Sequence, residues 1–405
     1  MKSPNRKEVE YFVNDLLDIF IIIEENGKPI LNTLQKFSNS INKEILDFVY
    51  RYNDRFPQLN QLPSFFRKLS HNDYFIFLPN IELDQLELFK LKEYYETIKE
   101  GKEYVNPSND LLEKYIDLLK KYKINFIGSK RISIGERNKS KRVCRFCKKK
   151  NGETTFKNKA HAISEALGNK TVMLFDECDK CNKFFSETIE PDMVQSLSLF
   201  RTFFGVKGKG GNKKIKGKNF YLKNDGKINL VFNSLNDRPD PLSKNYNLKL
   251  NLDQPINFQN IYKTLCKYFL SVIDGNELAH FRKTIDWVKG DLEIESLPKI
   301  GELISYDFFT LQPKLTYYIR KDKRCTRHPY AIGEFRFTCK IMIFIVPLSD
   351  YDKKNFLKES DYKYFWKTFK HYHKYKDCVF SDYSNNDAKD FSINLNFTKD
   401  EKEIK

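Results

Sequence analysis

Four of the eight cysteines in this sequence fall into two Cys-x2-Cys pairs, and thirty residues separate the pairs. In chain order the paired cysteines are Cys144, Cys147, Cys178 and Cys181. Two such pairs supply four thiolates, a ligand set that suits a closed tetrahedral zinc site. Charged residues flank each pair, which argues against four ordinary core cysteines. Because thiolates would fill all four coordination positions, the predicted Zn²⁺ is structural and is not the catalyst.

A single histidine, His161, lies between the two pairs in the stretch AHAISEALGN. A neutral imidazole accepts a proton near pH 7, so His161 is a candidate general base; the alternative is a buried structural histidine. The first pair, this stretch and the following ECDKCN together resemble the HNH endonuclease family, particularly its zinc-knuckle members. The resemblance covers residues 141–205 closely, and the stretch from IYKTLCKYFL to FRKTIDWV less specifically.

The resemblance implies a ββα-metal fold, in which a hairpin, a loop and a helix surround one divalent ion. It implies that His161 is the general base, that Asn169 holds the loop between the strands, and that Asn182 coordinates the catalytic ion. Phosphodiester hydrolysis needs a base to deprotonate water and a cation to offset charge on the phosphate and the leaving oxygen. Mg²⁺ or Mn²⁺ suits this role, because such an ion prefers oxygen ligands and needs few protein groups.

Two positions depart from the pattern that this family implies. Many members carry an acidic residue immediately before the histidine and a proline shortly after it, where this chain has Ala160 and Ser164. The missing acid leaves three interpretations open: Asn182 holds the ion nearly alone, another acid helps, or the site is degenerate. The acids that could help are Glu165, Asp176, Glu187 and Glu190.

Two basic clusters flank the histidine in sequence. Residues 137–150 hold eight basic residues and no acid, and residues 205–218 hold six lysines and several glycines. If they also flank the site in space, they could contact phosphates without reading sequence; the alternative is a pair of solvated loops. The expected nucleic-acid contacts are Arg142, Arg145, Arg201, Lys207, Lys209, Lys213 and Lys214.

The overall charge agrees with a polyanionic partner but is weaker support. The net charge is +17 with a pI near 9.2, in a chain whose Lys, Asn and Ile content indicates an AT-rich genome. No stretch reaches the roughly 20 apolar residues of a membrane span, and the first residues lack a signal-peptide pattern. We therefore expect a cytoplasmic protein without membrane contact, in which cysteines stay reduced and bind metal.

The elements around this segment follow from periodicity. Helical spacing predicts helices over residues 8–23, 30–52, 82–101 and 106–122. Residues 219–233 predict a β-hairpin turning at Asn224–Gly226, residues 257–273 a helix, and residues 314–320 and 334–348 one strand each. The fold class is therefore α+β, with a small zinc-stabilised ββα unit between a mainly helical and a mixed α/β region.

We expect five regions along the chain. They are a helical accessory domain (1–125), the HNH nuclease domain with its four-cysteine zinc site (126–205), a basic Gly/Lys loop (206–218), a mixed α/β domain (219–395) and a tail (396–405). The accessory and C-terminal regions are candidates for binding a regulatory protein or for homo-oligomerisation.

The sequence favours a divalent-metal-dependent HNH endonuclease that hydrolyses DNA phosphodiester bonds. Prokaryotic nucleases of this kind often serve in anti-phage defence, an association that comes from the family. Two alternatives stay open: a non-catalytic zinc-knuckle protein that binds nucleic acid, which Ala160 favours, and an RNA endonuclease.

Overall fold

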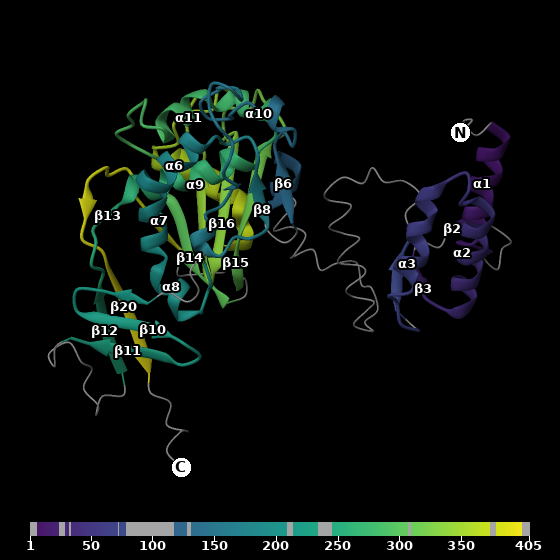
Figure 1. Cartoon of the computed structure of the whole chain (residues 1–405), viewed down its shortest axis with the longest axis horizontal. Helices are drawn as coiled ribbons and strands as arrows, with labels where there is room; N and C mark the ends of the chain where they lie inside the picture. The colour runs from purple at the N-terminus through teal and green to yellow at the C-terminus, as the bar shows by residue number, and fades with distance from the viewer. Residues whose placement is uncertain are drawn as a thin grey trace, which may run out of the picture. The chain divides into compact units, whose positions relative to one another are not determined.

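A computed structural model describes residues 6–23, 29–31, 34–71, 73–77, 117–127, 131–208, 214–233, 245–306, 309–372 and 378–398 (Figure 1). The chain divides into an N-terminal unit, Met1–Ile116, and a C-terminal unit, Asp117–Lys405. No helix among the described residues is long and apolar enough to cross a membrane.

The N-terminal unit combines short helices with short strands. Its elements are α1 (Arg6–Asp18), β1 (Ile21–Ile23), β2 (Pro29–Leu31), β3 (Leu34–Lys36), α2 (Asn39–Tyr52), η1 (Pro57–Gln61), α3 (Leu62–Phe66) and β4 (Tyr74–Ile76). The helix predicted over residues 8–23 ends at Asp18, because the β-branched run Ile21–Ile23 pairs with Pro29–Leu31 instead. Ser38 caps α2 by accepting a hydrogen bond from the Ile41 amide. The helix predicted over residues 82–101 lies outside the described residues, and so does the helix predicted over residues 106–122 as far as residue 116; residues 117–121 are helical, and a strand begins at Tyr122.

A six-stranded antiparallel sheet is the centre of the C-terminal unit, with the strand order β18-β14-β17-β16-β15-β5. Its strands are β5 (Tyr122–Ile127), β14 (Ile300–Ile304), β15 (Thr310–Arg320), β16 (Ala331–Thr338), β17 (Lys340–Ile345) and β18 (Val379–Ser381). The single strand predicted over residues 334–348 is wrong. The chain turns at Thr338, whose φ is +52°, and β16 and β17 pair as a tight hairpin.

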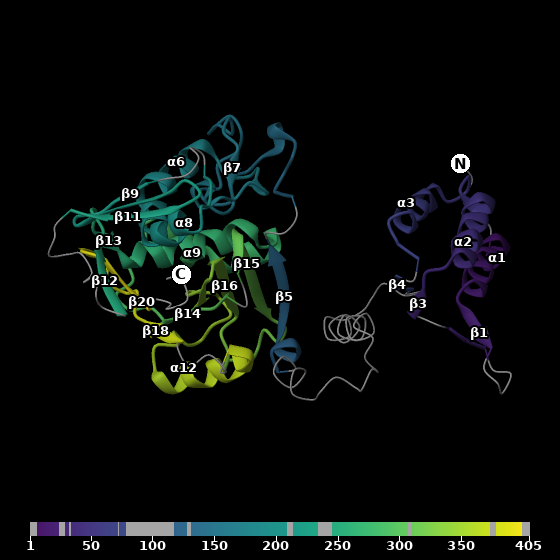
Figure 2. The same ribbon diagram turned by 90° about the horizontal axis from the view of Figure 1, so that it is seen from below.

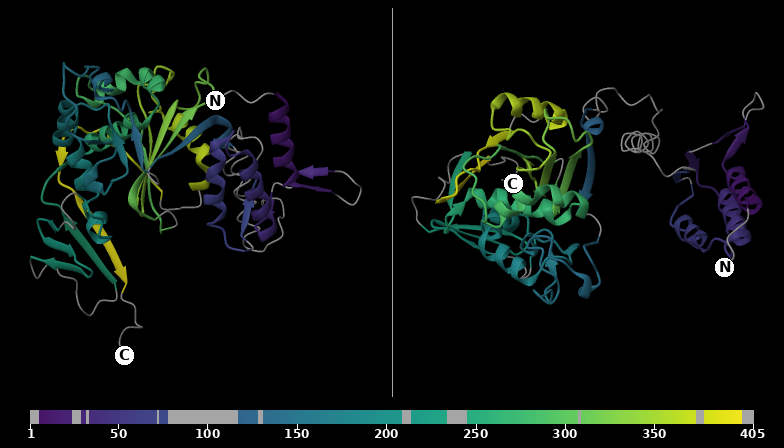
Figure 3. Two further views of the ribbon diagram at one scale, coloured as in Figure 1. Left: turned by 45° about the vertical axis from the view of Figure 1, so that its right-hand side comes forward. Right: turned by 90° about the horizontal axis from the view of Figure 1, so that it is seen from above.

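Helices cover both faces of this sheet. The long helix α9 (Phe258–Val272) lies on one face and α12 (Glu359–Trp366) on the other (Figures 2 and 3). Nearly every residue of α9 is buried, and Asn257 caps it through the Asn260 amide. Shorter helices complete the layers: α10 (Gly275–Leu278), η5 (Ala279–Phe281), α11 (Arg282–Val288) and η7 (Lys367–Tyr372).

The cysteine segment, residues 131–205, packs on the side of α9 that faces away from the sheet (Figure 2). Its elements are β6 (Ile132–Ile134), η2 (Lys139–Lys141), β7 (Ala160–His161), η3 (Glu165–Leu167), β8 (Val172–Leu174), α6 (Asp179–Thr188), α7 (Glu190–Ser196) and α8 (Ser198–Phe203). Strand β8 lies between β6, which is parallel to it, and β7, which is antiparallel. The antiparallel pair β7 and β8 followed by α6 forms a ββα unit.

Small antiparallel sheets follow the cysteine segment. They are β9 (Ile215–Lys216) with β10 (Phe220–Asn224) and β11 (Ile228–Phe232), β12 (Asn245–Asn251) with β20 (Ser392–Thr398), and β13 (Ile256–Asn257) with β19 (Ala388–Lys389). The predicted hairpin is confirmed as β10 and β11, and Gly226 provides the positive φ of +107° that its turn requires. Strand β20 extends to Thr398, beyond the residue at which the tail was expected to begin.

One hydrophobic core joins the cysteine segment, α9 and residues of the six-stranded sheet. Buried residues of the cysteine segment, such as Phe146 and Leu167, belong to the same cluster as Leu265 of α9 and Phe335 of β16. The mixture of helix and sheet agrees with the predicted α+β class. The structure shows no break in packing at residue 205, and the boundary between the two units follows Ile116, because Tyr122–Ile127 pairs with β15 of the C-terminal unit.

Candidate active site and metal centre

The four paired cysteines come together as predicted. Among the described residues, they form the one group of His, Cys, Asp or Glu side chains placed to share a metal ion, and their sulfurs lie within 4.8 Å of one another. The Cys147 and Cys178 Sγ atoms are 3.7 Å apart. A tetrahedral zinc with Zn–S bonds of about 2.3 Å places its sulfurs roughly 3.8 Å apart. The spacing and the ligand chemistry therefore fit Zn²⁺.

The close approach of these thiols shifts the pKa values of the cysteines. A hydrogen bond from Cys181 is the main cause that lowers the pKa of Cys144 to about 5. The same contact raises the pKa of Cys181 far above that of an ordinary thiol, and burial raises the pKa of Cys147 to about 11. Four thiolates this close repel one another, and a divalent cation offsets that repulsion.

His161 lies on β7, and its backbone pairs with Met173 of β8. Its side chain is 19% exposed, its Nδ1 atom is buried, and its Nε2 atom lies 3.7 Å from a carboxylate oxygen of Glu165. Ala160, the preceding residue, is buried in the core. Because successive side chains of a strand point to opposite faces, Ala160 fills the core while His161 points away from it.

Asn169 pins the loop that connects β7 to β8. Its amide nitrogen donates to the carbonyl oxygens of Ile163 at 2.7 Å and of Val172 at 3.1 Å. Its amide oxygen accepts from the backbone amides of Thr171 at 3.1 Å and Val172 at 3.0 Å. These contacts are those of a residue that holds the loop.

Asn182 lies in the first turn of α6, and its side chain is half-buried. Asp179, three residues earlier on the same helix, accepts hydrogen bonds from the amides of Lys157 at 2.9 Å and Asn158 at 2.8 Å, and from the Thr155 hydroxyl. Residues 155–158 lead directly into β7. The start of α6 is therefore tied to the strand that carries His161.

The structure separates the four acids considered as further metal ligands. Asp176 pairs with the buried Arg145 at 3.2 Å, and the exposed Glu187 lies 3.9 Å from Lys183. Glu190 pairs with Lys267 at 3.0 Å. Glu165 is the one of the four that lies beside His161.

The expected nucleic-acid contacts differ in their exposure. Lys207 and Lys214 are exposed, and Arg142 is half-buried, stacks on Phe175 and donates to the Glu136 and Arg137 carbonyls. Lys209 and Lys213 lie outside the described residues. The exposed basic residues between 137 and 150 are Arg137, Lys139, Lys141, Lys148, Lys149 and Lys150.

Two of the expected contacts are buried, which argues against contact with a phosphate. Arg145 is 5% exposed and uses its guanidinium on Asp176 and on the Leu270 carbonyl oxygen. Arg201 is 3% exposed beside Gly208, and burial lowers its pKa. Both arginines face the core of the C-terminal unit rather than its surface.

Sequence reasoning missed three residues that build the site: Asp179, Glu177 and Lys267. Asp179 and Glu177 flank Cys178, so the only signal was their position in ECDKCN. Lys267 interrupts an apolar helix at TLCKYFL, a pattern that indicates a buried charge with a distant partner.

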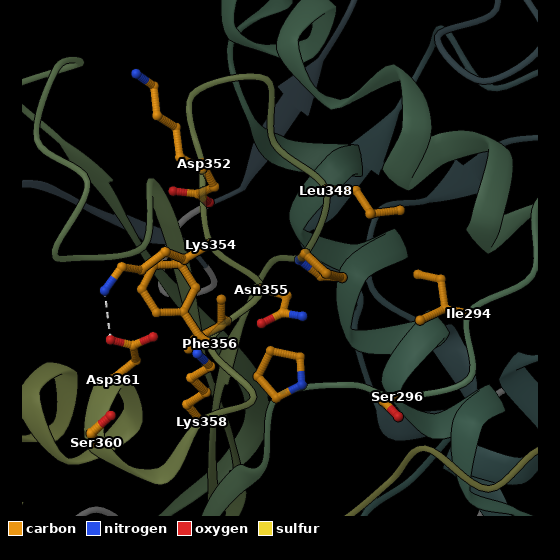
Figure 4. Close-up of a pocket in the computed structure, with 14 residues that line it drawn as sticks. Ile294, Ser296, Leu348, Asp352, Lys354, Asn355, Phe356, Lys358, Ser360 and Asp361 are labelled. Carbon is orange, nitrogen blue, oxygen red and sulfur yellow. Dashed lines mark hydrogen bonds and ion pairs between the residues drawn. The ribbon is translucent and has the colours of Figure 1, made fainter.

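A pocket of about 820 Å³ lies elsewhere in the C-terminal unit (Figure 4). It is lined by residues after β17 and at the start of α12, including Leu348, Asn355, Phe356 and Lys358. None of the residues lining it belongs to the cysteine segment, so this pocket is separate from the site around His161.

Comparison with known proteins bears on the same segment. No curated protein and no solved structure gave a match to the chain. A sequence model of the HNH endonuclease family matches residues 144–198, which include both cysteine pairs, β7, β8, α6 and α7. The ββα unit that carries His161 and Asn182 lies within this match, so residues 144–198 are similar to the HNH endonuclease family.

Proposed function

We propose that this protein is a divalent-metal-dependent endonuclease that hydrolyses DNA phosphodiester bonds. The observation that carries the proposal is the ββα unit, in which β7 carries His161 and α6 carries Asn182. Asp179 of α6 accepts hydrogen bonds from the residues that precede β7, which connects the helix to the strand. This unit lies in the segment that matches the family model. The four thiolates frame it without supplying an open coordination position.

His161 takes the proton of the attacking water through Nε2, the ring nitrogen that lies beside Glu165. A positioned general base of this kind contributes about 10² to 10⁴ in rate. The Asn182 amide oxygen and the Glu165 carboxylate would hold Mg²⁺ or Mn²⁺, which supplies positive charge to the phosphate and the leaving oxygen. Glu165 thereby takes the role that an acid before the histidine has in many members.

Exposed lysines supply the contacts to the substrate backbone. Lys207 and Lys214 follow α8, and Lys139, Lys141, Lys149 and Lys150 surround the first cysteine pair. Such contacts bind phosphates independently of sequence and weaken as salt rises. The same base and cation would also cleave RNA, so substrate choice depends on these contacts.

Cleavage of supercoiled plasmid and of single-stranded RNA, each with Mg²⁺ and with Mn²⁺, tests the proposal. We expect the wild-type protein to cut plasmid and His161→Ala to lose about 10²-fold or more in rate while it still binds DNA. Preferential cutting of RNA would favour the RNA endonuclease. DNA binding with no cutting of either substrate would favour the non-catalytic zinc module.

A further inference from the structure

Lys267 of α9 reaches into the cysteine segment from behind the ββα unit. Its side chain is 1% exposed. Its ammonium nitrogen lies 3.3 Å from the backbone oxygen of His161, 3.0 Å from Oε1 of Glu190 and 3.5 Å from Oε2 of Glu177. A lysine ammonium has three donors, and here three acceptors surround it.

These three acceptors belong to three different parts of the cysteine segment. His161 lies on β7, and Glu190 is the first residue of α7. Glu177 directly precedes Cys178, which caps α6, the helix that carries Asn182. One ammonium therefore joins the strand of the proposed base to the start of the helix of the proposed metal ligand.

The surroundings of Lys267 hold this arrangement in place. The Phe185 ring of α6 lies 5.7 Å from its ammonium nitrogen and packs edge-on against Phe146, between the first two cysteines. Glu177 is 1% exposed. Burial of an ammonium costs free energy unless acceptors surround it. An arrangement that breaks these contacts would leave a buried charge unpaired, so the observed arrangement of the cluster is strongly favoured. Such a cluster can fix the backbone of His161 more tightly than the short strand β7 alone.

We propose that Lys267 is a positioning residue for the endonuclease site, which acts by holding the His161 backbone in register with α6. The inference rests on the proposed function of that site. Lys267 is too deeply buried to contact the substrate, so it acts through His161 and Asn182 and not by binding phosphate. Its removal is therefore expected to lower kcat and leave KM and DNA affinity unchanged.

Lys263 provides a matched control on the same helix. It lies one turn before Lys267, is 9% exposed, and places its ammonium 5.8 Å from the centre of the Trp287 ring of α11. Lys263→Met and Lys267→Met thus remove the same buried charge from the same helix, and only Lys267→Met removes the contact with His161.

Lys267→Met would leave the carboxylates of Glu177 and Glu190 without their cation, and a double variant removes one of these two charges. Lys267→Met combined with Glu190→Gln removes one charge of each sign, so the fold is expected to tolerate it better than Lys267→Met alone, and the contact with the His161 carbonyl stays lost. The zinc content and the thermal unfolding midpoint of each variant test whether the four-cysteine site and the fold are retained.

The measurements are kcat and KM on plasmid, together with Mn²⁺ affinity by calorimetry. We expect the single and the double variant to lose about 100-fold in kcat, as a displacement near 1 Å costs. We expect Mn²⁺ affinity to fall about 10-fold, as it does when outer partners of metal ligands are removed. Lys263→Met is expected to stay within about 3-fold of wild type on both readouts, far below those losses.

Three outcomes would overturn the inference. They are wild-type kcat in the double variant, an equal loss in Lys263→Met, and a loss expressed in KM or DNA affinity instead of kcat. A wild-type protein that binds Mn²⁺ without cutting would contradict the proposed function, and the Mn²⁺ affinities of the variants would then decide the positioning role. A wild-type protein that neither cuts nor binds Mn²⁺ would contradict both.

Discussion

Glu165 occupies the position where the chemistry of the site lacked an acid. Its carboxylate lies 3.7 Å from Nε2 of His161, and η3, which begins with Glu165, follows β7 closely. Ala160 is 2% exposed in the core, so a carboxylate at that position would be buried rather than placed beside the imidazole. In the proposed site, the acid beside the imidazole is therefore the fourth residue after His161 instead of the residue before it.

We predict that Glu165→Gln weakens binding of the catalytic cation. The substitution keeps the shape of the side chain and removes its charge, so the cleavage rate at low Mn²⁺ should fall about 10-fold or more, and higher Mn²⁺ should restore it. A titration of cleavage rate against Mn²⁺ measures this shift. Glu187→Gln, on the exposed face of α6, is the control and should match the wild type. An unchanged Mn²⁺ dependence of Glu165→Gln would leave Asn182 as the principal ligand.

Residue roles could be predicted from sequence where they depend on local spacing. The cysteine pairs and Asn169 act within a few residues of their positions in the motif, and the structure places them as that motif implies. Burial could not be predicted, because it depends on distant elements. Arg145 looked like part of a basic cluster, yet its guanidinium is covered by the Leu270 carbonyl of α9 and by Asp176.

The strands of the cysteine segment are short, and we infer that the four-cysteine cluster helps to hold them in place. Strand β7 has two residues and β8 has three, so hydrogen bonds between them cannot alone hold His161. Cys178 caps α6, and its neighbour Asp179 anchors the chain that enters β7. The four-cysteine cluster thus lies at the junction of the helix and the hairpin.

We predict that removal of one thiolate unfolds the cysteine segment. Structural zinc contributes an apparent free energy of about 10–16 kcal/mol in zinc-finger peptides, which is as large as the whole stability of most domains, roughly 5–15 kcal/mol. Cys181→Ala should therefore lose bound zinc, cleavage activity and the hydrogen-exchange protection of residues 131–205. Cys266→Ala, at a buried cysteine of α9 outside the cluster, should keep one zinc per chain. Zinc retained at full occupancy in Cys181→Ala would contradict a four-thiolate site.

Long periodic elements were predictable, and their ends were less so. The apolar spacing of α9 and the turn residues of the β10–β11 hairpin are local signals, and both elements appear as expected. The end of α1 at Asp18 and the turn at Thr338 follow from pairing with the next strand along the chain, which helical or strand periodicity alone does not reveal. Strand propensity depends on the partner that a segment finds, so periodicity within the segment does not fix where it ends.

At the scale of the whole molecule, the cysteine segment is part of a larger hydrophobic core. It packs on α9, which packs on the six-stranded sheet, and buried residues of all three layers form one cluster. Lys267 of α9 contacts His161 of the cysteine segment, and Arg145 of the cysteine segment contacts Leu270 of α9. The position of the proposed active site therefore depends on residues far outside the matched segment, such as Lys267.

The boundary of this unit can be tested with two truncations. Strand β5 pairs with β15 along its full length, Tyr122 is fully buried, and its hydroxyl donates to the Pro329 carbonyl at 2.9 Å. A fragment of residues 117–405 keeps these contacts, whereas a fragment of residues 126–405 loses Tyr122 and leaves β15 as an exposed edge strand. Loss of one large buried aromatic side chain alone costs about 3–5 kcal/mol.

We expect the 117–405 fragment to bind zinc, to unfold cooperatively and to cut plasmid at a rate close to that of the full chain. The 126–405 fragment should unfold at a much lower temperature or aggregate, because an unpaired edge strand offers a template for pairing with other chains. Differential scanning calorimetry and size-exclusion chromatography measure the difference. Equal stability of the two fragments would show that β5 is dispensable and that the unit begins after residue 125. A stable but inactive 117–405 fragment would assign part of the activity to the N-terminal unit.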